Sequence, residues 1–538
     1  MKGEFAGGIG GVRRAGGRQM GIGRHWPALL VGIAAVLLAA PLWAVDLPAM
    51  PDLPAHIACF YLLAGGIKDP HLAQFYRIDW QYVPNLASEI AVPFLSHVMG
   101  LVPAAKLFLT AAVGLWVLGA AAIQRALFGR VGVASLMAAF FTYNANFFWG
   151  FLNYDFTAGL DLLVFAAWIA TARWPRRRRL VLFTAIVTAV YFCHLFAEAV
   201  LLLMIGCFEL DALIREKKLF TRHTLARAVV MAVLVLPSAL AFLFLKPKAA
   251  DGGHLEFNFL STWDDRLDAF FQLHYDAPGY IILALLALLW FVGVWRGWLK
   301  FHPAMRLVVL ALLATAVFMP EWALGGWGVD LRLPPILGAV AFASVEFRLS
   351  VRRQAALAAA AMITLAFCAA GAGGNWAYYD RQYAEFRAAL AERPRGVKLL
   401  TVLDGDAMGL ASDQPYWHIA EFAILDRAGF SPLLFTTAGQ HVVRDQPAYQ
   451  AVAAATAQQG SPPDVGELDD LAAGQADGDK DIPEEFPYLM FFQCHFDEVV
   501  VIRSGGKPSP APDLLKLRHR GSFFDLYDVK SDGACVKS

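Results

Sequence analysis

The chain of 538 residues has little charge. Asp, Glu, Lys and Arg make up 17% of it, and apolar residues make up 58%, against about 25% and about 45–50% in soluble globular domains. This composition is typical of a membrane protein and excludes an ordinary water-soluble one. Acidic and basic residues both number 45, so no overall charge excess indicates a nucleic-acid partner.

Cysteine is also scarce. The six cysteines include no Cys-x-x-Cys pair and no Cys/His spacing typical of zinc sites, so the sequence predicts neither a disulfide framework nor a structural zinc site. Cys494 and Cys535 both lie in the polar C-terminal region and would pair if that region faces an oxidising compartment. The alternative is two free thiols, because Cys535 lies close to a chain end that can fray.

Long apolar runs are present, but only between residues 26 and 374. A helix of about 20 residues crosses a bilayer, and we expect about eleven spans, at 26–45, 105–123, 131–149, 155–172, 180–193, 195–210, 228–245, 279–295, 306–320, 334–347 and 355–374. Residues 1–25 are glycine-rich and are expected to be a disordered cytoplasmic leader. We expect the first run to be an uncleaved anchor, because it is too long for a signal peptide and lacks a good cleavage site.

Basic residues predict the orientation. The segments placed in the cytoplasm carry 23 Lys and Arg, and the opposite loops carry seven. By the positive-inside rule the N-terminus is cytoplasmic, and an odd number of crossings leaves the C-terminus outside. Eleven spans satisfy this, as would nine or thirteen.

Residues 375–538 differ from the apolar part, with 15 basic and 24 acidic residues, a net charge of −9. Alternating patterns predict a small α/β extracytoplasmic domain. The expected helices are 379–391, 414–427 and 448–458, the expected strands are 397–403, 433–437, 496–503 and 522–529, and 461–485 is expected to be an acidic surface loop.

The long first outside loop, residues 46–104, begins with two carboxylates, Asp46 and Asp52. Prolines between them oppose helix formation, and helices lying along the membrane interface are expected at 55–64 and 86–98. Asp52 either caps the first of these helices or acts as a base or cation ligand. Asp46 has no helix to cap. His56 lies one turn beyond Asp52, where it can join the same cluster.

Three further places on the outer side carry polar candidates. Trp149, Asn153 and Asp155 lie in an aromatic turn that suits sugar rings or forms an interfacial aromatic belt. His194 and Glu198 lie one helical turn apart near the outer end of a span, where ionisable residues are functional candidates; a satisfied core histidine is the alternative.

Arg332 is the candidate at the third of these places. It precedes Pro334 and Pro335 at the outer start of a span. A guanidinium there can bind a lipid phosphate through two hydrogen bonds. The alternatives are a pair with Asp330 or a headgroup anchor.

Four short stretches, 51–56, 149–154, 192–196 and 332–335, together with this layout, resemble a bacterial membrane protein group within the GT-C glycosyltransferase superfamily. The resemblance implies a helical polytopic protein of the bacterial inner membrane with a periplasmic C-terminal domain. It also implies transfer of a sugar from a polyprenyl-phosphate donor to an envelope glycan, lipid or protein acceptor. The loop acid that serves as base matches Asp46 or Asp52, and His56 favours Asp52. The loop lacks an Asp-x-Asp or Asp-Glu pair, so a divalent cation is not required by the pattern and metal dependence stays open.

Two other functions fit a polytopic chain. A transporter or flippase would place ionisable residues at the bilayer midplane and often has two matching halves, but here only Asp161 lies well inside a span. A non-catalytic scaffold would use the C-terminal domain as an assembly surface. The concentration of polar candidates on one side favours the transferase.

Overall fold

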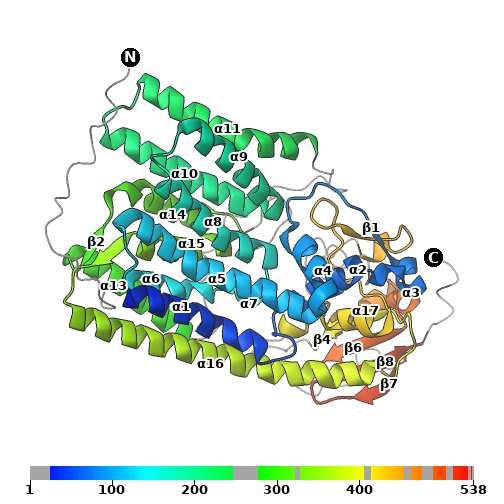
Figure 1. Cartoon of the computed structure of the whole chain (residues 1–538). Coiled ribbons are helices and arrows are strands. Elements are labelled where there is room, and N and C mark those ends of the chain that lie inside the picture. The colour runs from blue at the N-terminus through cyan, green and yellow to red at the C-terminus, as the bar shows by residue number, and fades with distance from the viewer. Residues whose placement is uncertain are drawn as a thin grey trace.

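The computed structural model describes residues 25–245, 277–321, 328–404, 414–453, 462–474, 489–503, 513–530 and 535. The predicted leader lies outside these residues, apart from His25. A bundle of helices forms one part of the molecule and a smaller mixed domain, here called the head, forms the other (Figure 1). The head consists of the described residues from 397 to 535.

A helix is present at each predicted span. These helices are α1 (Trp26–Ala39), α5 (Leu101–Phe128), α6 (Val133–Ala138), α8 (Leu152–Ala170), α9 (Arg176–Cys193), α10 (Leu195–Arg215), α11 (Arg222–Phe244), α13 (Ala277–Trp295), α14 (Arg306–Phe318), α15 (Leu333–Ala343) and α16 (Val351–Leu390). Within the described part of the chain, four stretches are long and apolar enough to cross a membrane, namely Trp26–Trp43, Leu101–Phe128, Arg222–Phe244 and Val351–Leu390. The number of crossings stays a prediction.

Helices α5 and α8 pack closely at the centre of the bundle. A Cβ atom on Gly119 of α5 would lie 2.7 Å from the Cβ atom of Leu162 in α8. Membrane helices lack a strong hydrophobic drive to associate and use small residues to bring their backbones together. This contact therefore fixes α8, whose first turn carries Asn153 and Asp155, against the centre of the bundle.

Several predicted boundaries were wrong. The span expected at 131–149 is broken into α6, the 3-10 helix η4 (Ala139–Thr142) and α7 (Ala145–Trp149), because the Asn144 side chain caps α7 by accepting from Phe147 N–H at 3.2 Å. Helix α15 ends at Ala343, and the following β3 (Val345–Phe347) pairs with β2 (Leu299–Phe301). The helix expected at 379–391 is continuous with the last span, which makes α16 a 40-residue helix.

Helices α9 and α10 form a hairpin with one non-helical residue, His194, between them. The Arg179 guanidinium near the start of α9 lies 3.7 Å from the Glu209 carboxylate near the end of α10. Residues of the first outside loop hold the turn, because Leu86 N–H donates to the Phe192 carbonyl at 2.9 Å.

The first outside loop contains α2 (Leu53–Leu63), α3 (Pro70–Phe75), β1 (Tyr76–Ile78) and α4 (Ala87–Met99). The prediction that both longer helices lie along the interface was wrong for α2, where nine of eleven residues are buried. They are buried because α2 packs against the bundle on one side and contributes to the core of the head on the other. Helix α4 exposes the apolar side chains of Ile90, Phe94 and Val98, as expected of an interfacial helix.

The head contains a four-stranded sheet in the order β4 (Leu399–Leu403), β6 (Glu498–Ile502), β8 (Phe524–Val529) and β7 (Leu515–Arg520). The sheet confirms the strands expected at 397–403, 496–503 and 522–529, whereas β7 was not predicted. The segment 433–437 is irregular rather than a strand. The short strand β5 (Val443–Asp445) pairs instead with β1 of the first outside loop, so the loop and the head share a second, two-stranded sheet.

Two helix predictions in the head hold only in part. Residues 414–427 form the 3-10 helices η8 (Gln414–Tyr416) and η9 (Ile419–Glu421) followed by α17 (Phe422–Arg427). Of the helix expected at 448–458, α18 covers Gln450–Ala453, and residues 454–458 lie outside the described chain. The expected acidic loop contains η11 (Val465–Glu467) and α19 (Leu468–Ala473), and its residues 475–485 lie outside the described chain. The Cys494–Cys535 disulfide is formed, with a Cα–Cα distance of 5.3 Å.

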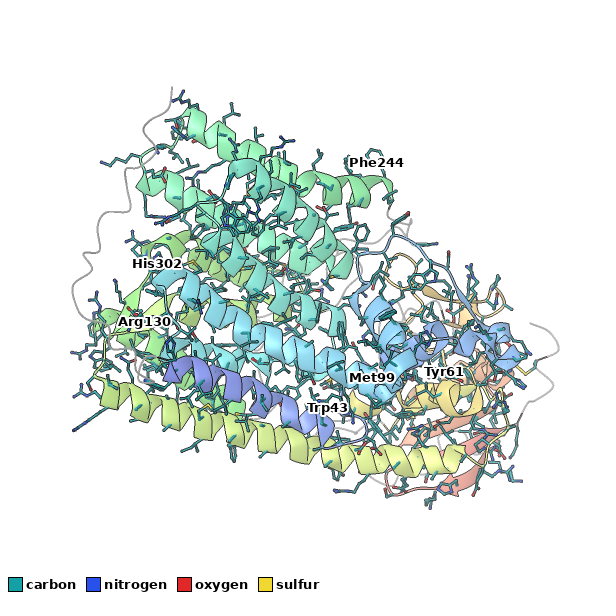
Figure 2. All side chains as sticks on the ribbon, viewed as in Figure 1. Trp43, Tyr61, Met99, Arg130, Phe244 and His302 are labelled. Atoms are coloured by element: carbon teal, nitrogen blue, oxygen red, sulfur yellow. A yellow bond between two sulfur atoms is a disulfide. The ribbon has the colours of Figure 1, made fainter. Side chains whose placement is uncertain are left out.

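The bundle has two distinct ends. Arg130 and His302 lie at the end far from the head, while Trp43, Met99 and Tyr61 lie toward the head (Figure 2). The predicted cytoplasmic and outside segments are thus separated along the long direction of the molecule.

Candidate active site between the first loop and the head

Asp52 lies where α2, the end of α7 and the head meet. Its backbone N–H donates to the Trp149 carbonyl at 3.0 Å. The intervening turn passes close to it because Gly150 adopts φ +91°, and a Cβ atom there would lie 3.3 Å from the Asp52 Cβ atom. Asp52 is the residue before α2, but its side chain makes no capping hydrogen bond. Its carboxylate is therefore not used to start the helix.

The side chain that faces Asp52 comes from the head. His418 Nε2 lies 4.0 Å from Asp52 Oδ1, and His418 Nδ1 lies 3.2 Å from Glu421 Oε1. His418 and Glu421 are three residues apart across η9, and side chains at this spacing eclipse on a 3-10 turn. Both are nearly inaccessible, at 2% and 0% exposure. Asp52, His418 and Glu421 therefore form a continuous acid–histidine–acid row.

Burial and the neighbouring charges have opposite effects on the pKa values of Asp52 and His418. Burial raises the pKa of Asp52 to about 6, against the lowering effects of His418 and Arg332. Burial alone would lower the pKa of His418, but Glu421 and then Asp52 outweigh it and raise that pKa. The acids on either side of His418 thus stabilise its protonated form.

His56 lies on the other side of the same cluster, and the Phe435 ring separates the histidines. Ring centroids of His56 and His418 lie 5.0 Å from that of Phe435, and that of His441 lies 5.3 Å away. Burial lowers the pKa of His56 to about 3, which leaves its imidazole neutral. His56 Nδ1 is buried with no hydrogen-bond partner among the described residues.

Arg332 approaches from the bundle, at the end of the 3-10 helix η6 (Asp330–Arg332). Its guanidinium carbon lies 5.4–5.7 Å from the ring centroids of Phe151, Tyr154 and Phe196. Cation–π contacts of this kind hold a guanidinium without neutralising it. The positive charge is near enough to Asp52 to act on that carboxylate, so opposite charges flank the same region.

The predicted aromatic turn has two separate roles in the structure. Trp149 packs its ring against Trp417 of the head, with centroids 5.6 Å apart. Asn153 holds the start of α4: its Oδ1 accepts from Ser88 N–H at 2.6 Å, and its Nδ2 donates to Glu89 Oε2 at 2.8 Å. Trp149 therefore lies beside the candidate site, while the Asn153 amide is engaged by protein groups.

Asp155, His194 and Glu198 lie deeper in the bundle. Asp155 Oδ1 accepts from Asn144 Nδ2 at 3.3 Å, and the Glu198 carboxylate is 4% exposed. His194 Nδ1 caps α10 by accepting from Ala197 N–H at 3.4 Å. The His194 ring lies 5.3 Å from that of Tyr154, which in turn contacts Arg332. Of these three residues, His194 is linked to the candidate site most directly.

Asp46, the alternative loop acid, is in a different environment. Its side chain is exposed, and its backbone N–H donates to Asp380 Oδ2 of α16 at 2.9 Å. Asp380 also accepts from Leu47 N–H, so this contact ties the exit of the first helix to α16. The structure brings Asp52, but not Asp46, to the row that contains His418.

The sequence analysis missed His418 and Glu421, and also the pair Glu89 and His441, whose Oε1 and Nδ1 atoms lie 4.0 Å apart. A polar pair with i, i+3 spacing inside an otherwise apolar segment, Trp417–Ile424, was the available signal. It was weak because the partner, Asp52, lies more than 360 positions earlier in the chain.

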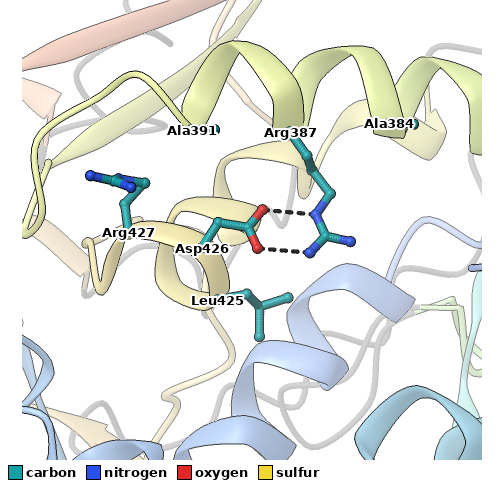
Figure 3. Close-up of a pocket in the computed structure, with 6 residues that line it drawn as sticks. All are labelled: Ala384, Arg387, Ala391, Leu425, Asp426 and Arg427. Carbon is teal, nitrogen blue, oxygen red and sulfur yellow. Dashed lines mark hydrogen bonds and ion pairs between the residues drawn. The ribbon is translucent and has the colours of Figure 1, made fainter.

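Two other features bear on possible ligands. Among the described residues, no group of three or more His, Cys, Asp or Glu side chains has a geometry that could hold a metal ion. A surface pocket of about 470 Å³ lies between α16 and α17, lined by Ala384, Arg387, Ala391, Leu425, Asp426 and Arg427 (Figure 3). None of the predicted site residues lines this pocket, where the Arg387 guanidinium forms two 2.7 Å hydrogen bonds with Asp426.

Comparisons with known proteins place the fold. No protein-family model matches the chain, and no curated protein sequence matches it. The chain is similar in structure to ArnT from Cupriavidus metallidurans in the apo state, with a TM-score of 0.50 and 13% identity over 93% of this chain and 97% of ArnT. ArnT bound to undecaprenyl phosphate gives a TM-score of 0.48 at 14% identity, with the same coverage of both chains.

The arabinofuranosyltransferase AftD from Mycobacteria gives a TM-score of 0.43 at 15% identity, over 95% of this chain and 40% of AftD. At these identities the likeness concerns the fold. The chain shares its fold with apo ArnT, and this likeness together with the apolar helices supports a membrane location.

Proposed function

We propose that the chain is a glycosyltransferase that moves a sugar from a polyprenyl-phosphate donor to an acceptor hydroxyl at the outer face of the bacterial inner membrane. The observation that carries the proposal is the Asp52 carboxylate, which is only 18% exposed, caps no helix, faces His418 of the head and feels the positive charge of Arg332 from the bundle. ArnT, which shares the fold, binds undecaprenyl phosphate, and we propose a carrier of this class for the present chain.

In the proposed reaction Asp52 is the base. The acceptor hydroxyl oxygen attacks the anomeric carbon of the donor sugar and gives its proton to an Asp52 carboxylate oxygen. The bond between the anomeric carbon and the phosphate oxygen breaks, and its electron pair leaves with the polyprenyl phosphate. General-base catalysis of this kind contributes about 10²–10⁴-fold to the rate.

Arg332 supplies the complementary charge. Negative charge grows on the phosphate as it leaves, and a fixed cation stabilises that change without having to reorganise. The aromatic rings around Arg332 hold its guanidinium in place by cation–π contacts. Among the other predicted residues, we assign Trp149 and His194 to the sugar, because Trp149 is hydrogen-bonded to Asp52 through its carbonyl and His194 packs beside Tyr154, a neighbour of Arg332. Asn153 and Asp155 act through the packing of α4 and α8, and Glu198 acts through its hydrogen bond with Ser238 of α11.

The decisive experiment compares the two loop acids. Purified Asp52→Asn and Asp46→Asn proteins are assayed with radiolabelled polyprenyl-phosphate sugars and an extract of envelope acceptors. We expect the Asp52 variant to lose about 10²-fold or more in transfer rate and the Asp46 variant to stay within a few-fold of the native protein. Full activity in the Asp52 variant, or no transfer by the native protein with any donor tested, would refute the proposal.

A further inference from the structure

The row of Asp52, His418 and Glu421 joins two parts of the chain that the sequence separates widely. Asp52 belongs to the first outside loop, and His418 and Glu421 belong to the head. Every distance in the row is short enough for direct electrostatic coupling, 4.0 Å from Asp52 to His418 and 3.2 Å from His418 to Glu421.

Glu421 is built into the head as a fixed partner for His418. Its Oε1 atom also accepts from the Ser431 hydroxyl at 3.2 Å, and its side chain has no exposed surface. The Ser431 backbone N–H donates to the Tyr76 hydroxyl at 3.1 Å, and Tyr76 lies in β1, the strand of the first outside loop that pairs with the head. The first outside loop therefore contributes Asp52 at one end of the row and, through Tyr76 and Ser431, supports Glu421 at the other.

The imidazole is fixed on its other sides as well. The Phe435 ring contacts His418 edge-on, and Trp417 packs on Trp149, whose carbonyl accepts from Asp52 N–H. The contacts orient His418 Nε2 toward Asp52 and Nδ1 toward Glu421. A buried histidine between two acids is favoured as the imidazolium.

We propose that His418, held by Glu421, is a positioning residue that keeps Asp52 ionised and oriented, so that the head completes the catalytic site. The inference rests on the proposed function, in which Asp52 accepts the proton of the acceptor hydroxyl. A base must be unprotonated before it can act, and burial raises the pKa of Asp52, to about 6 in the folded chain. The positive charge on His418 opposes that effect.

The charged and titratable groups around the row are few. Arg332 of η6 acts on Asp52, and His56 of α2 and His441 lie near His418 across the Phe435 ring. Burial lowers the pKa of His56 to about 3 and that of His441 to about 4. Both are therefore neutral near neutral pH, and the cations that act on Asp52 are His418 and Arg332.

The test measures kcat/KM against pH for the native protein and for His418→Gln and Glu421→Gln. In the native protein kcat/KM should fall at low pH as Asp52 becomes protonated; we call this fall the acidic limb. Removing the imidazolium, or the carboxylate that holds it, should move the midpoint of the acidic limb upward by about one pH unit. At alkaline pH, where Asp52 is ionised in every protein, the rates should approach each other. A merely structural role would lower the rate at all pH values and leave the limb in place.

His441→Gln is the matched control, since it also removes a buried histidine in contact with Phe435. Its acidic limb should stay where it is in the native protein. An equal shift in this variant would overturn the proposal, because general damage to the cluster would then explain the result.

An infrared pH titration makes the test independent of turnover. The carboxyl absorption that Asp52→Asn removes is assigned to Asp52, and its midpoint should rise in His418→Gln. A native protein that transfers no sugar but shows the rise would refute the proposed function alone. An active native protein whose limb and midpoint do not move in His418→Gln would refute this inference alone.

Discussion

Buried acids at the two ends of the helical bundle differ in whether their oxygens have hydrogen-bond and ion-pair partners. At the end far from the head, Glu209 of α10 lies 2.9 Å from Arg227 of α11 and 3.7 Å from Arg179 of α9, and it accepts from Trp168 Nε1 at 2.9 Å. Toward the head, Glu198 in the first turn of α10 has a carboxyl oxygen with no hydrogen-bond partner among the described residues, and so have both oxygens of Asp161, midway along α8.

The difference shows what each end contributes. An acid surrounded by guanidinium and indole donors is satisfied, and such a network stabilises helix packing. Buried acids with unused oxygens cost free energy and are typical of sites that act on a ligand. The ion-paired end thus acts as the support of the bundle, and the end near the head contains the proposed chemistry.

The largest expected effect is on the transfer rate, and it should distinguish Arg332, near the head, from Arg130 at the opposite end. Arg332→Ala should lower transfer by about 10²–10³-fold, because the leaving phosphate would lose its fixed cation, while the melting temperature changes little. Arg130→Ala is the control at the opposite end, where the side chain is 66% exposed and pairs with Glu346 at 2.6 Å. Exposed pairs of this kind contribute at most about 1 kcal/mol, so its transfer rate should be unchanged. Equal losses in both variants would remove the distinction between the ends.

A smaller effect, on stability rather than transfer, is expected from Glu209→Ala. It leaves Arg179 and Arg227 without their shared acid and should lower the free energy of unfolding by about 2–4 kcal/mol. Thermal unfolding in detergent measures this as a lower melting temperature. The pH dependence of transfer should stay the same, since Glu209 lies at the end far from Asp52. A changed pH profile would contradict the separation of the two ends.

Much of the bundle could be predicted, because a membrane span is recognised from a long apolar run in the local sequence. The sheet strands β4, β6 and β8 were also readable as short apolar runs. The break after α6 was not, since the Asn144 cap looks like any polar residue within an apolar run. The burial of α2 was missed because both of its partners, the bundle and the head, are contributed by distant parts of the chain.

The candidate site could be predicted only in part, for the same reason. Asp52 stood out because it lies in a proline-rich stretch just beyond the first span, and Arg332 because the segments expected outside carry only seven basic residues. His418 lies in the head, where a single histidine is unremarkable, and its segment meets the first outside loop through contacts of α2 with η9 and α17 and through the pairing of β1 with β5. Local sequence patterns do not encode a contact of that kind.

The smallest expected effect concerns Glu89, the buried acid of α4 near His441. Burial raises its pKa to about 7, against the hydrogen bonds from Asn153 and Ser88. A carboxyl group whose pKa is higher in the folded than in the unfolded chain binds more protons when folded. Its contribution to stability is therefore present at low pH and is lost as the pH rises from about 4.5 to about 7.

Glu89→Gln keeps the shape of the side chain and removes this dependence. Compared with the native protein, the variant should gain about 1–3 kcal/mol of stability when the pH is raised from 4.5 to 8. Melting temperatures of both proteins across this range measure the gain, and Glu346→Gln, at the ion-paired end, is the control. If Glu89→Gln gains no stability over this pH range, Glu89 must have a positively charged partner that cancels the effect of burial on its pKa. The acids near the head would then be ion-paired like Glu209, which would contradict the comparison of the two ends.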